Sequence, residues 1–153
     1  MTLQDSHISL AHGNGGRFMR ELIDEVFARH LASDTLDTTA DAVRLSLPGE
    51  EILFTTDGFT VQPLEFPGGS IGSLAVHGTT NDLAVAGADP LYLSLNAFIE
   101  EGFDVAQLER IVADLGRAAS EIGVSVAAGD TKVLPRGQGG GIYLATTGIG
   151  ALR

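Results

Sequence analysis

The chain has 153 residues, of which 44% are hydrophobic and 19% charged, and this composition is that of one globular domain with its own core. Its net charge of −11, with only nine Lys and Arg residues, argues against a nucleic-acid partner, because binding to the phosphate backbone needs a basic patch. The chain has no cysteine, which excludes disulfides, thiolate metal sites and a cysteine nucleophile in these residues.

The N-terminal segment MTLQDSHISL has neither the basic start nor the apolar stretch of a signal peptide, and no later apolar run reaches about 18 residues. We therefore expect a cytoplasmic protein. The turn HGNGG follows at residues 12–16, and apolar residues at helical spacing then predict a helix over residues 16–31. A glycine-rich turn that opens a helix can hold phosphate oxygens, although this one is neither a Walker A loop nor a G-x-G-x-x-G turn after a strand.

Residues 43–57 have the pattern of a β-hairpin. Val43, Leu45 and Leu47 alternate with polar residues, and a Pro-Gly turn follows. The run EILFTT is then expected to form the second strand, which ends at Asp57.

The stretch VHGTTNDLAVAGADP, residues 76–90, carries Asn81 and Asp82 among small and apolar residues. We expect a helix over residues 70–87, and at about 100° per residue Asp82 lies in the middle of a stripe that should be buried. A buried, unpaired carboxylate would cost several kcal/mol, so this one would need a cation, N–H donors or a metal ion. The stripe consists of Ile71, Ala75, Gly78, Asp82 and Ala86.

Strands and helices alternate in the second half of the chain. Residues 91–99 alternate as a strand, Asp104 begins a helix through a capping box, and Gly123 ends it. Further strands are expected at residues 124–128 and 142–150. The expected fold class is α/β or α+β, a single domain with a mixed sheet flanked by helices.

Three carboxylates are candidates for a magnesium site. Asp57 and Asp130 follow predicted strands, and Asp82 lies on the stripe described above. Carboxylate oxygens suit Mg²⁺, which takes one or two protein carboxylates beside substrate phosphates and water. The alternative is that each Asp is a turn or cap residue bonded to nearby N–H groups.

Lys132 is the single lysine of the chain and comes directly after Asp130 and Thr131. Its ammonium could neutralise a γ-phosphate or polarise a transferring oxygen, with a plain surface lysine as the alternative. Glu101 is a candidate for proton transfer, although a solvated turn at the end of a strand explains it as well. The four histidines show no metal-ligand spacing, and His12 in the glycine turn has the most suggestive position.

Three segments closely resemble the HypE family of hydrogenase maturation factors, which are carbamoyl dehydratases of the PurM-like ATP-binding superfamily. They are TTDGFTVQPLEFPGGSIGSLAVHGTTNDLAVAGADPLYLS, FIEEG and AAGDTKVLPRG. The resemblance extends from HGNGG to TTGIGA, and FPGG, GT-x-ND-LA and GDTKV together are specific to this family. One departure is His77, at a position before GT where the family often has Cys.

The resemblance implies an enzyme that binds Mg-ATP and dehydrates an S-carbamoyl group on its own C-terminal cysteine to a thiocyanate, the source of cyanide for nickel–iron hydrogenase. Asp57, Asp82 and Asp130 would hold Mg²⁺, and Lys132 would contact the reacting phosphoryl or carbamoyl group. The implied ATP-binding set is His12, Gly13, Asn14, Gly15, Gly16, Asp57, Asn81, Asp82, Asp130, Thr131 and Lys132.

The resemblance also implies a PurM N-terminal-like domain whose sheet pairs with that of a second copy in a homodimer. The implied partners are the carbamoyltransferase HypF and the HypC–HypD complex. Family members have a second α/β domain and a cysteine-bearing tail, so we expect residues 1–153 to be one ATP-binding and dimerisation domain that does not complete the dehydration by itself.

Two alternatives stay open from the sequence. One is another PurM-like ATP enzyme, such as thiamine-monophosphate kinase, aminoimidazole ribonucleotide (AIR) synthetase or selenophosphate synthetase. The other is a non-catalytic dimerisation module.

Overall fold

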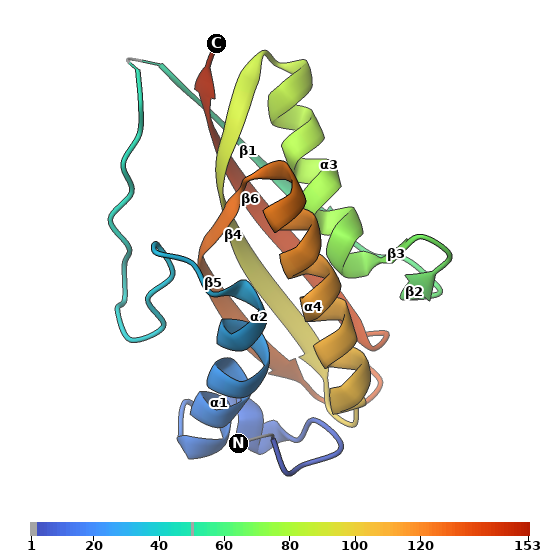
Figure 1. Cartoon of the computed structure of the whole chain (residues 1–153). Helices are drawn as coiled ribbons and strands as arrows, with labels where there is room; N and C mark the ends of the chain where they lie inside the picture. The colour runs from blue at the N-terminus through green and yellow to red at the C-terminus, as the bar shows by residue number, and fades with distance from the viewer. Residues whose placement is uncertain (1–2, 50) are drawn as a thin grey trace.

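The computed structural model describes residues 3–49 and 51–153, which form a mixed sheet with helices packed on one of its faces (Figure 1). The N-terminal helical elements are η1 (Leu10–Gly13), α1 (Arg17–Leu22), the π-helical η2 (Ile23–Ala28) and α2 (Arg29–Leu31). The remaining elements are β1 (Ile52–Phe59), β2 (Glu65–Phe66), β3 (Gly69–Ser70), α3 (Ile71–Val85), β4 (Ala88–Glu100), α4 (Val105–Ile122), β5 (Ser125–Leu134) and β6 (Ile142–Leu152). The predicted fold class is confirmed.

The main sheet has the strand order β1-β6-β4-β5, in which β4 and β5 are parallel and the other neighbours antiparallel. Helices α3 and α4 lie side by side across one face, and the small β2–β3 hairpin projects from the start of α3 (Figure 1). Because the parallel pair needs a crossover, α4 connects β4 to β5 over that face. Asp57 lies within β1 and Asp130 within β5, so the expectation that each directly follows its strand is wrong.

Helix α4 has the sequence pattern that most plainly explains its packing, with apolar residues at helical spacing that are buried. Asp104 caps its N-terminus by accepting a hydrogen bond from Gln107 N–H at 2.6 Å, and Gly123 ends it with a φ of 74°. The Gln107 side chain donates to Glu65 at 3.0 Å, so the expected reciprocal bond of a capping box is replaced by this contact. No helix in the described part of the chain is long and apolar enough to cross a membrane.

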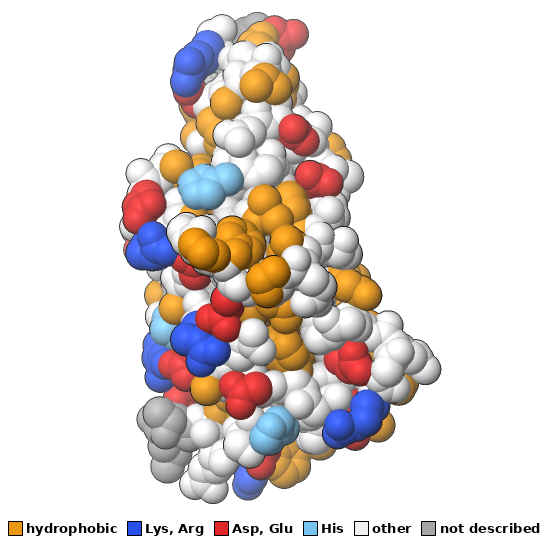
Figure 2. Space-filling view, turned by 90° about the vertical axis from the view of Figure 1, so that its right-hand side faces the viewer, with side chains coloured by type: hydrophobic (Ala, Val, Ile, Leu, Met, Phe, Trp, Pro, Cys, Tyr) orange, Lys and Arg blue, Asp and Glu red, His pale blue; other side chains and the backbone are white. Residues whose placement is uncertain are grey.

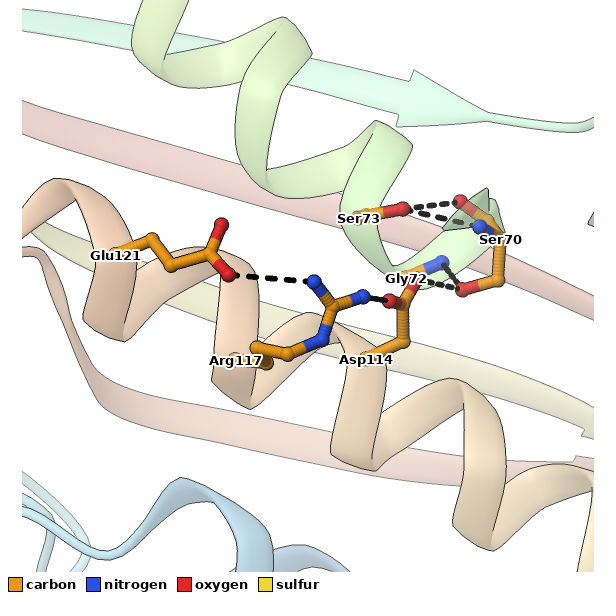
Figure 3. A network of polar contacts seen from close by, with 6 residues as sticks. All are labelled: Ser70, Gly72, Ser73, Asp114, Arg117 and Glu121. Carbon is orange, nitrogen blue, oxygen red and sulfur yellow. Dashed lines mark hydrogen bonds and ion pairs between the residues drawn. The ribbon is translucent and has the colours of Figure 1, made fainter. Parts of the chain in front are cut away.

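The start of α3 is joined to α4 by a short polar network (Figure 3). The Ser70 hydroxyl accepts from Gly72 N–H at 3.1 Å and donates to Asp114 at 2.6 Å. Arg117, on the next turn of α4, pairs with Asp114 and with Glu121 (Figure 3). The network satisfies the N–H of Gly72 in the first turn of α3 and links this end of the helix to α4.

Hydrogen bonds determine the charge state of Asp114 in this network. Burial raises its pKa, but the hydroxyl groups of Ser70 and Ser73 and the charge of Arg117 outweigh burial and hold the pKa of Asp114 below its usual range. The carboxylate is therefore charged at neutral pH.

The hairpin predicted for residues 43–57 is wrong. Residues 43–47 belong to no strand, and Ser46 O instead accepts a hydrogen bond from the Tyr92 hydroxyl at 3.0 Å. Strand β1 pairs with β6, from Ile52 opposite Ala151 to its last residue. Alternation of apolar and polar residues indicates an extended backbone but does not determine which strand it pairs with. Here β1 pairs with β6, which is distant in sequence.

The face of the sheet opposite the helices carries exposed apolar side chains. Phe54 is 68% exposed and Tyr143 37% exposed. Phe54 pairs with Ile149 across β1 and β6, so these two side chains share the open face. This face is uncovered by the described residues of one chain, apart from the segment near Tyr92.

Candidate functional site

Asp130 and Lys132 of the GDTK motif form an ion pair on strand β5. Lys132 Nζ lies 2.8 Å from Asp130 Oδ2, and Thr131 N–H donates to Asp130 Oδ1 at 2.8 Å. The Lys132 ammonium first, and then the Thr131 N–H, hold the pKa of Asp130 below its usual range. The Thr131 side chain is buried, so Asp130 and Lys132 are the members of this segment whose side chains face solvent.

The glycine turn of residues 12–16 lies against this part of β5. A Cβ placed on Gly13 would lie 3.0 Å from the Cβ of Val133, the residue after Lys132. Gly15 adopts a φ of 72°, a left-handed conformation that favours glycine. The structure thus brings the HGNGG turn and the GDTK segment together, although more than 100 residues separate them in the sequence.

The His12 ring itself is buried within this turn. Its Nδ1 lies 3.0 Å from Ser9 N and its Nε2 lies 3.4 Å from Asp5 Oδ2. Ser9 N–H donates to Nδ1, which leaves Nε2 to carry the proton, and this buried N–H makes no hydrogen bond to any described residue. In this conformation a ligand can meet the backbone of His12 but not its ring.

Asp57 and Asp82 lie near the same part of α3. The Oδ2 of Asp57 is 3.8 Å from the position that a Cβ on Gly78 would take, and Asp82 comes one helical turn after Gly78. Asp57 Oδ1 accepts from Gly58 N–H at 2.8 Å. The neighbouring Asn81 is exposed, as is Asp82.

The prediction that Asp82 is buried is wrong. The helix is present, but its buried face is centred on Ala75, Val76 and Thr79, and Asp82 is at the edge of that arc. The reason is that α3 packs against both the sheet and α4, so its buried face is wide. The predicted stripe assumed that the helix packs against a single surface. Water solvates the carboxylate, so its position does not by itself require a metal ion.

The three candidate carboxylates do not converge within one chain. Asp57 pairs with Thr146 on β6. Asp130 pairs with Asn96 on β4, which in turn pairs with Ala145 on β6. Because neighbouring residues of a strand point to opposite faces, Asp57 and Asp130 lie on opposite faces of the sheet. Three strand spacings, about 14 Å, separate β1 from β5. In residues 3–49 and 51–153, no group of three His, Asp or Glu side chains could hold a metal ion. Figure 2 likewise shows acidic side chains scattered over the side that carries α3, above and below a central apolar area.

Glu101 lies at the turn that ends β4, where its N–H donates to Leu134 O at 2.8 Å. It is half-buried, and its neighbour Glu100 makes the more extensive side-chain contacts in this turn. No sequence pattern assigned a function to Glu100.

A pocket of about 160 Å³ lies beside Asp130, between the N-terminal helices and β5. Asp37 and Asp41 also line it, and the sequence assigned neither a role. Thr39 donates two hydrogen bonds to Asp37 and lowers its pKa, as expected for a turn residue. No local pattern marks Asp41, because the pocket forms from segments that are distant in sequence. Its apolar walls include Phe27, Leu31, Leu36, Val43, Leu95 and Val126.

A family model for the AIR synthase related protein, N-terminal domain, matches residues 39–152. The chain belongs to this family. The match includes the whole main sheet and both helices that cover it, but it begins after the glycine turn.

Curated relatives extend the similarity to the N-terminal turn. Carbamoyl dehydratase HypE of Azotobacter vinelandii is 47% identical over 152 residues, which are 99% of this chain and 45% of the relative. The HypE of Rhizobium leguminosarum bv. viciae is 49% identical over 150 residues, 98% of this chain and 43% of the relative. The chain therefore spans less than half the length of these relatives.

Solved structures agree with these relatives. Hydrogenase maturation protein HypE in complex with ATP has a TM-score of 0.91 and 49% identity over 95% of this chain and 43% of that chain. Escherichia coli HypE has a TM-score of 0.82 and 39% identity over 88% of this chain and 43% of that chain. The resemblance to HypE inferred from the motifs is confirmed.

Proposed function

We propose that this chain is the Mg-ATP-binding part of a carbamoyl dehydratase that serves hydrogenase maturation. The observation that carries the proposal is the packing of the glycine turn against β5 at Val133, the residue that directly follows Lys132 in the chain. Free N–H groups of such a turn suit phosphate oxygens, and β5 is an edge strand, from which the flexible Lys132 side chain could reach a phosphate bound at the turn. The similarity to a HypE structure that contains ATP supports the same ligand.

The carboxylates of this chain fit magnesium when the ion is carried by the nucleotide. Mg²⁺ commonly takes one or two protein carboxylates and completes its octahedron with phosphate oxygens and water. Asp130, or Asp57 together with Asp82, can supply that number of ligands, although the three are separate in one chain. When bound, the ion would offset the phosphate charge that an acidic protein otherwise repels.

Lys132 has the chemistry needed for phosphoryl transfer to a carbamoyl oxygen. Before a nucleotide binds, Asp130 holds its ammonium at 2.8 Å. A terminal phosphate would compete with Asp130 for this cation and would be stabilised as its negative charge develops. Glu101 remains the proposed proton-transfer group, and the pocket beside Asp130 is the proposed position of the nucleotide base.

The proposed protein acts as a homodimer whose open sheet faces pair. Exposed Phe54 and Tyr143 make this face apolar, as expected of a surface that a second copy covers. A solved HypE–HypF complex, 48% identical to this chain with a TM-score of 0.66, supports HypF as a partner. The HypC–HypD complex is a further proposed partner, and the cytoplasm is the proposed compartment.

Thiamine-monophosphate kinase is the less favoured alternative. The enzyme from Stenotrophomonas maltophilia K279a has 24% identity and a TM-score of 0.62, which is a likeness of fold. A non-catalytic dimerisation module is favoured only by the separation of the three carboxylates within one chain.

Titration calorimetry with ATP, with and without Mg²⁺, tests the proposed function. We expect binding that depends on Mg²⁺ and that is lost in Asp82→Asn without loss of the fold, because Asp82 is exposed. Asp34→Asn is the matched control, since Asp34 is also exposed and lies outside the site. Binding that is unchanged by removal of Mg²⁺ and by Asp82→Asn would refute the metal-nucleotide site.

A further inference from the structure

The last residue of β4, Glu100, is enclosed by the connection between β5 and β6. Its carboxylate accepts hydrogen bonds from the N–H groups of Gly137, Gly139 and Gly141, the last two at 3.2 and 3.0 Å. Several N–H groups that converge on one negative charge form the kind of backbone nest that binds anions. The connection thus folds around an anion that the chain itself supplies.

The connection fits closely around this carboxylate. A Cβ on Gly139 would lie 3.2 Å from the Glu100 Cβ, and Gly137 and Gly141 have φ values of 84° and 96° that favour glycine. The N–H of Gly137 first, and then those of Gly141 and Gly139, lower the pKa of Glu100. The carboxylate is therefore charged whenever the loop is in this conformation at neutral pH.

This nest joins two segments of the candidate site. Glu100 pairs with Leu134 in the β4–β5 register, and Lys132 lies two residues earlier on the same strand. The Gln62 side chain donates to Gly140 O at 3.2 Å, which attaches the segment that follows Asp57 to the same loop. The Glu100 carboxylate therefore fixes the point from which β5 turns back toward β6.

We infer that Glu100 is a positioning residue for Lys132: by holding the β5–β6 connection, it fixes the end of β5 so that the Lys132 ammonium meets the terminal phosphate of ATP. This inference rests on the proposed Mg-ATP site. Glu100→Gln tests it, because the carboxamide has a similar size but directs an NH₂ group at N–H donors and so loses part of the nest.

The experiment is a double-mutant cycle in which calorimetry measures the affinities for Mg-ATP and Mg-ADP. We expect Glu100→Gln to weaken Mg-ATP about tenfold and Mg-ADP less than about twofold, because ADP lacks the phosphate that Lys132 meets. In a Lys132→Met background, Glu100→Gln should cause no further loss. Glu121→Gln, which removes an exposed carboxylate on α4, is the matched control and should leave both affinities unchanged.

Equal losses for the two nucleotides, or losses that add in the double variant, would show a general structural role and overturn the inference. Thermal unfolding checks the fold of each variant. If Glu100→Gln does not fold, Glu100→Asp keeps the charge but shortens its reach and should show the same loss for Mg-ATP alone. A wild-type chain that binds no Mg-ATP would refute the proposed function itself, an outcome distinct from an uncoupled Glu100.

Discussion

Lys132 Nζ lies 2.8 Å from Asp130 Oδ2, across the one residue that separates them on β5. Alternate residues of a strand point to the same face, so the two charges meet on one side of β5. They are 60% and 51% exposed, and the glycine turn contacts the next residue, Val133. Val133 points to the other face, so the glycine turn packs on one side of this edge strand while the flexible Lys132 side chain starts from the adjacent residue on the other side.

Lys132→Met should weaken the binding of Mg-ATP while leaving the stability of the fold nearly unchanged. We expect Mg-ATP affinity to fall at least about tenfold, because the terminal phosphate loses its cation. The free energy of unfolding should change by less than about 1 kcal/mol, since exposed ion pairs contribute little. Calorimetry and urea unfolding measure the two quantities.

The chain offers a matched control in Arg153, which makes an exposed ion pair with Asp89 at 2.6 Å. Arg153→Met removes one positive charge, as Lys132→Met does, but at the end of β6. Equal losses of affinity in both variants would indicate a general effect of net charge and would contradict a specific role for Lys132.

The Asp114 network should stabilise the contact between α3 and α4. Asp114→Ala leaves the Ser70 hydroxyl and Arg117 without this partner, and we expect a loss of about 1–3 kcal/mol in the free energy of unfolding. Glu121→Ala, which removes the exposed partner of Arg117, should cost less than about 0.5 kcal/mol. A similar small loss in both variants would show that the Ser70 contact contributes little.

The same carboxylate predicts part of the acid sensitivity of the fold. Its pKa in the folded chain lies below the ordinary value of 3.8, so its stabilising effect is complete above that value and is lost as the pH falls through the folded pKa. Urea unfolding of wild type and Asp114→Ala should therefore converge in stability as the pH is lowered below about 4. A constant difference between the two at all pH values would argue against the lowered pKa.

Gly72 should tolerate no side chain, because a Cβ there would collide with Ile111 O on α4. We expect Gly72→Ala to lower the free energy of unfolding by about 1–3 kcal/mol through overpacking. The control is Gly58→Ala on β1, where a Cβ would have open space and the backbone needs no positive φ. If thermal unfolding shows equal effects, the close approach of α3 and α4 is not what selects glycine.

The open face of the sheet predicts self-association. Wild type should sediment as a dimer at micromolar concentration, and Phe54→Glu should sediment as a monomer, because it places a charge in the proposed interface. Val85→Glu changes an even more exposed residue, on α3, and should remain dimeric. A monomeric wild type, or a dimer that Val85→Glu disrupts and Phe54→Glu does not, would contradict the sheet pairing.

Local signals predicted the elements whose structure is determined locally. Helix α4 follows from its apolar spacing, and its ends follow from Asp104 and Gly123. The N-terminal helix was also predicted, but its π-helical middle, η2, has no signal in apolar spacing. The hairpin failed because the partner of β1 is β6, which lies far along the chain.

The sequence motifs named candidate site residues, but they did not predict how these residues are arranged in space. The motifs named Asp130 and Lys132, and the structure pairs them on β5 and places the glycine turn against the next residue, Val133. Helical periodicity gave Asp82 a buried position, because it does not show from which directions the sheet and α4 cover α3. Glu100 and Asp41 were missed, since the surroundings of each come from distant loops.

The most direct test of the central claim is amide NMR of the isotope-labelled chain during titration with Mg-ATP. The account predicts that residues 12–16 and 130–133 shift together and saturate at one nucleotide concentration, because the turn and β5 form one phosphate site. Shifts confined to other surfaces, with both segments unchanged at saturation, would show that the nucleotide binds elsewhere and would contradict the proposed site.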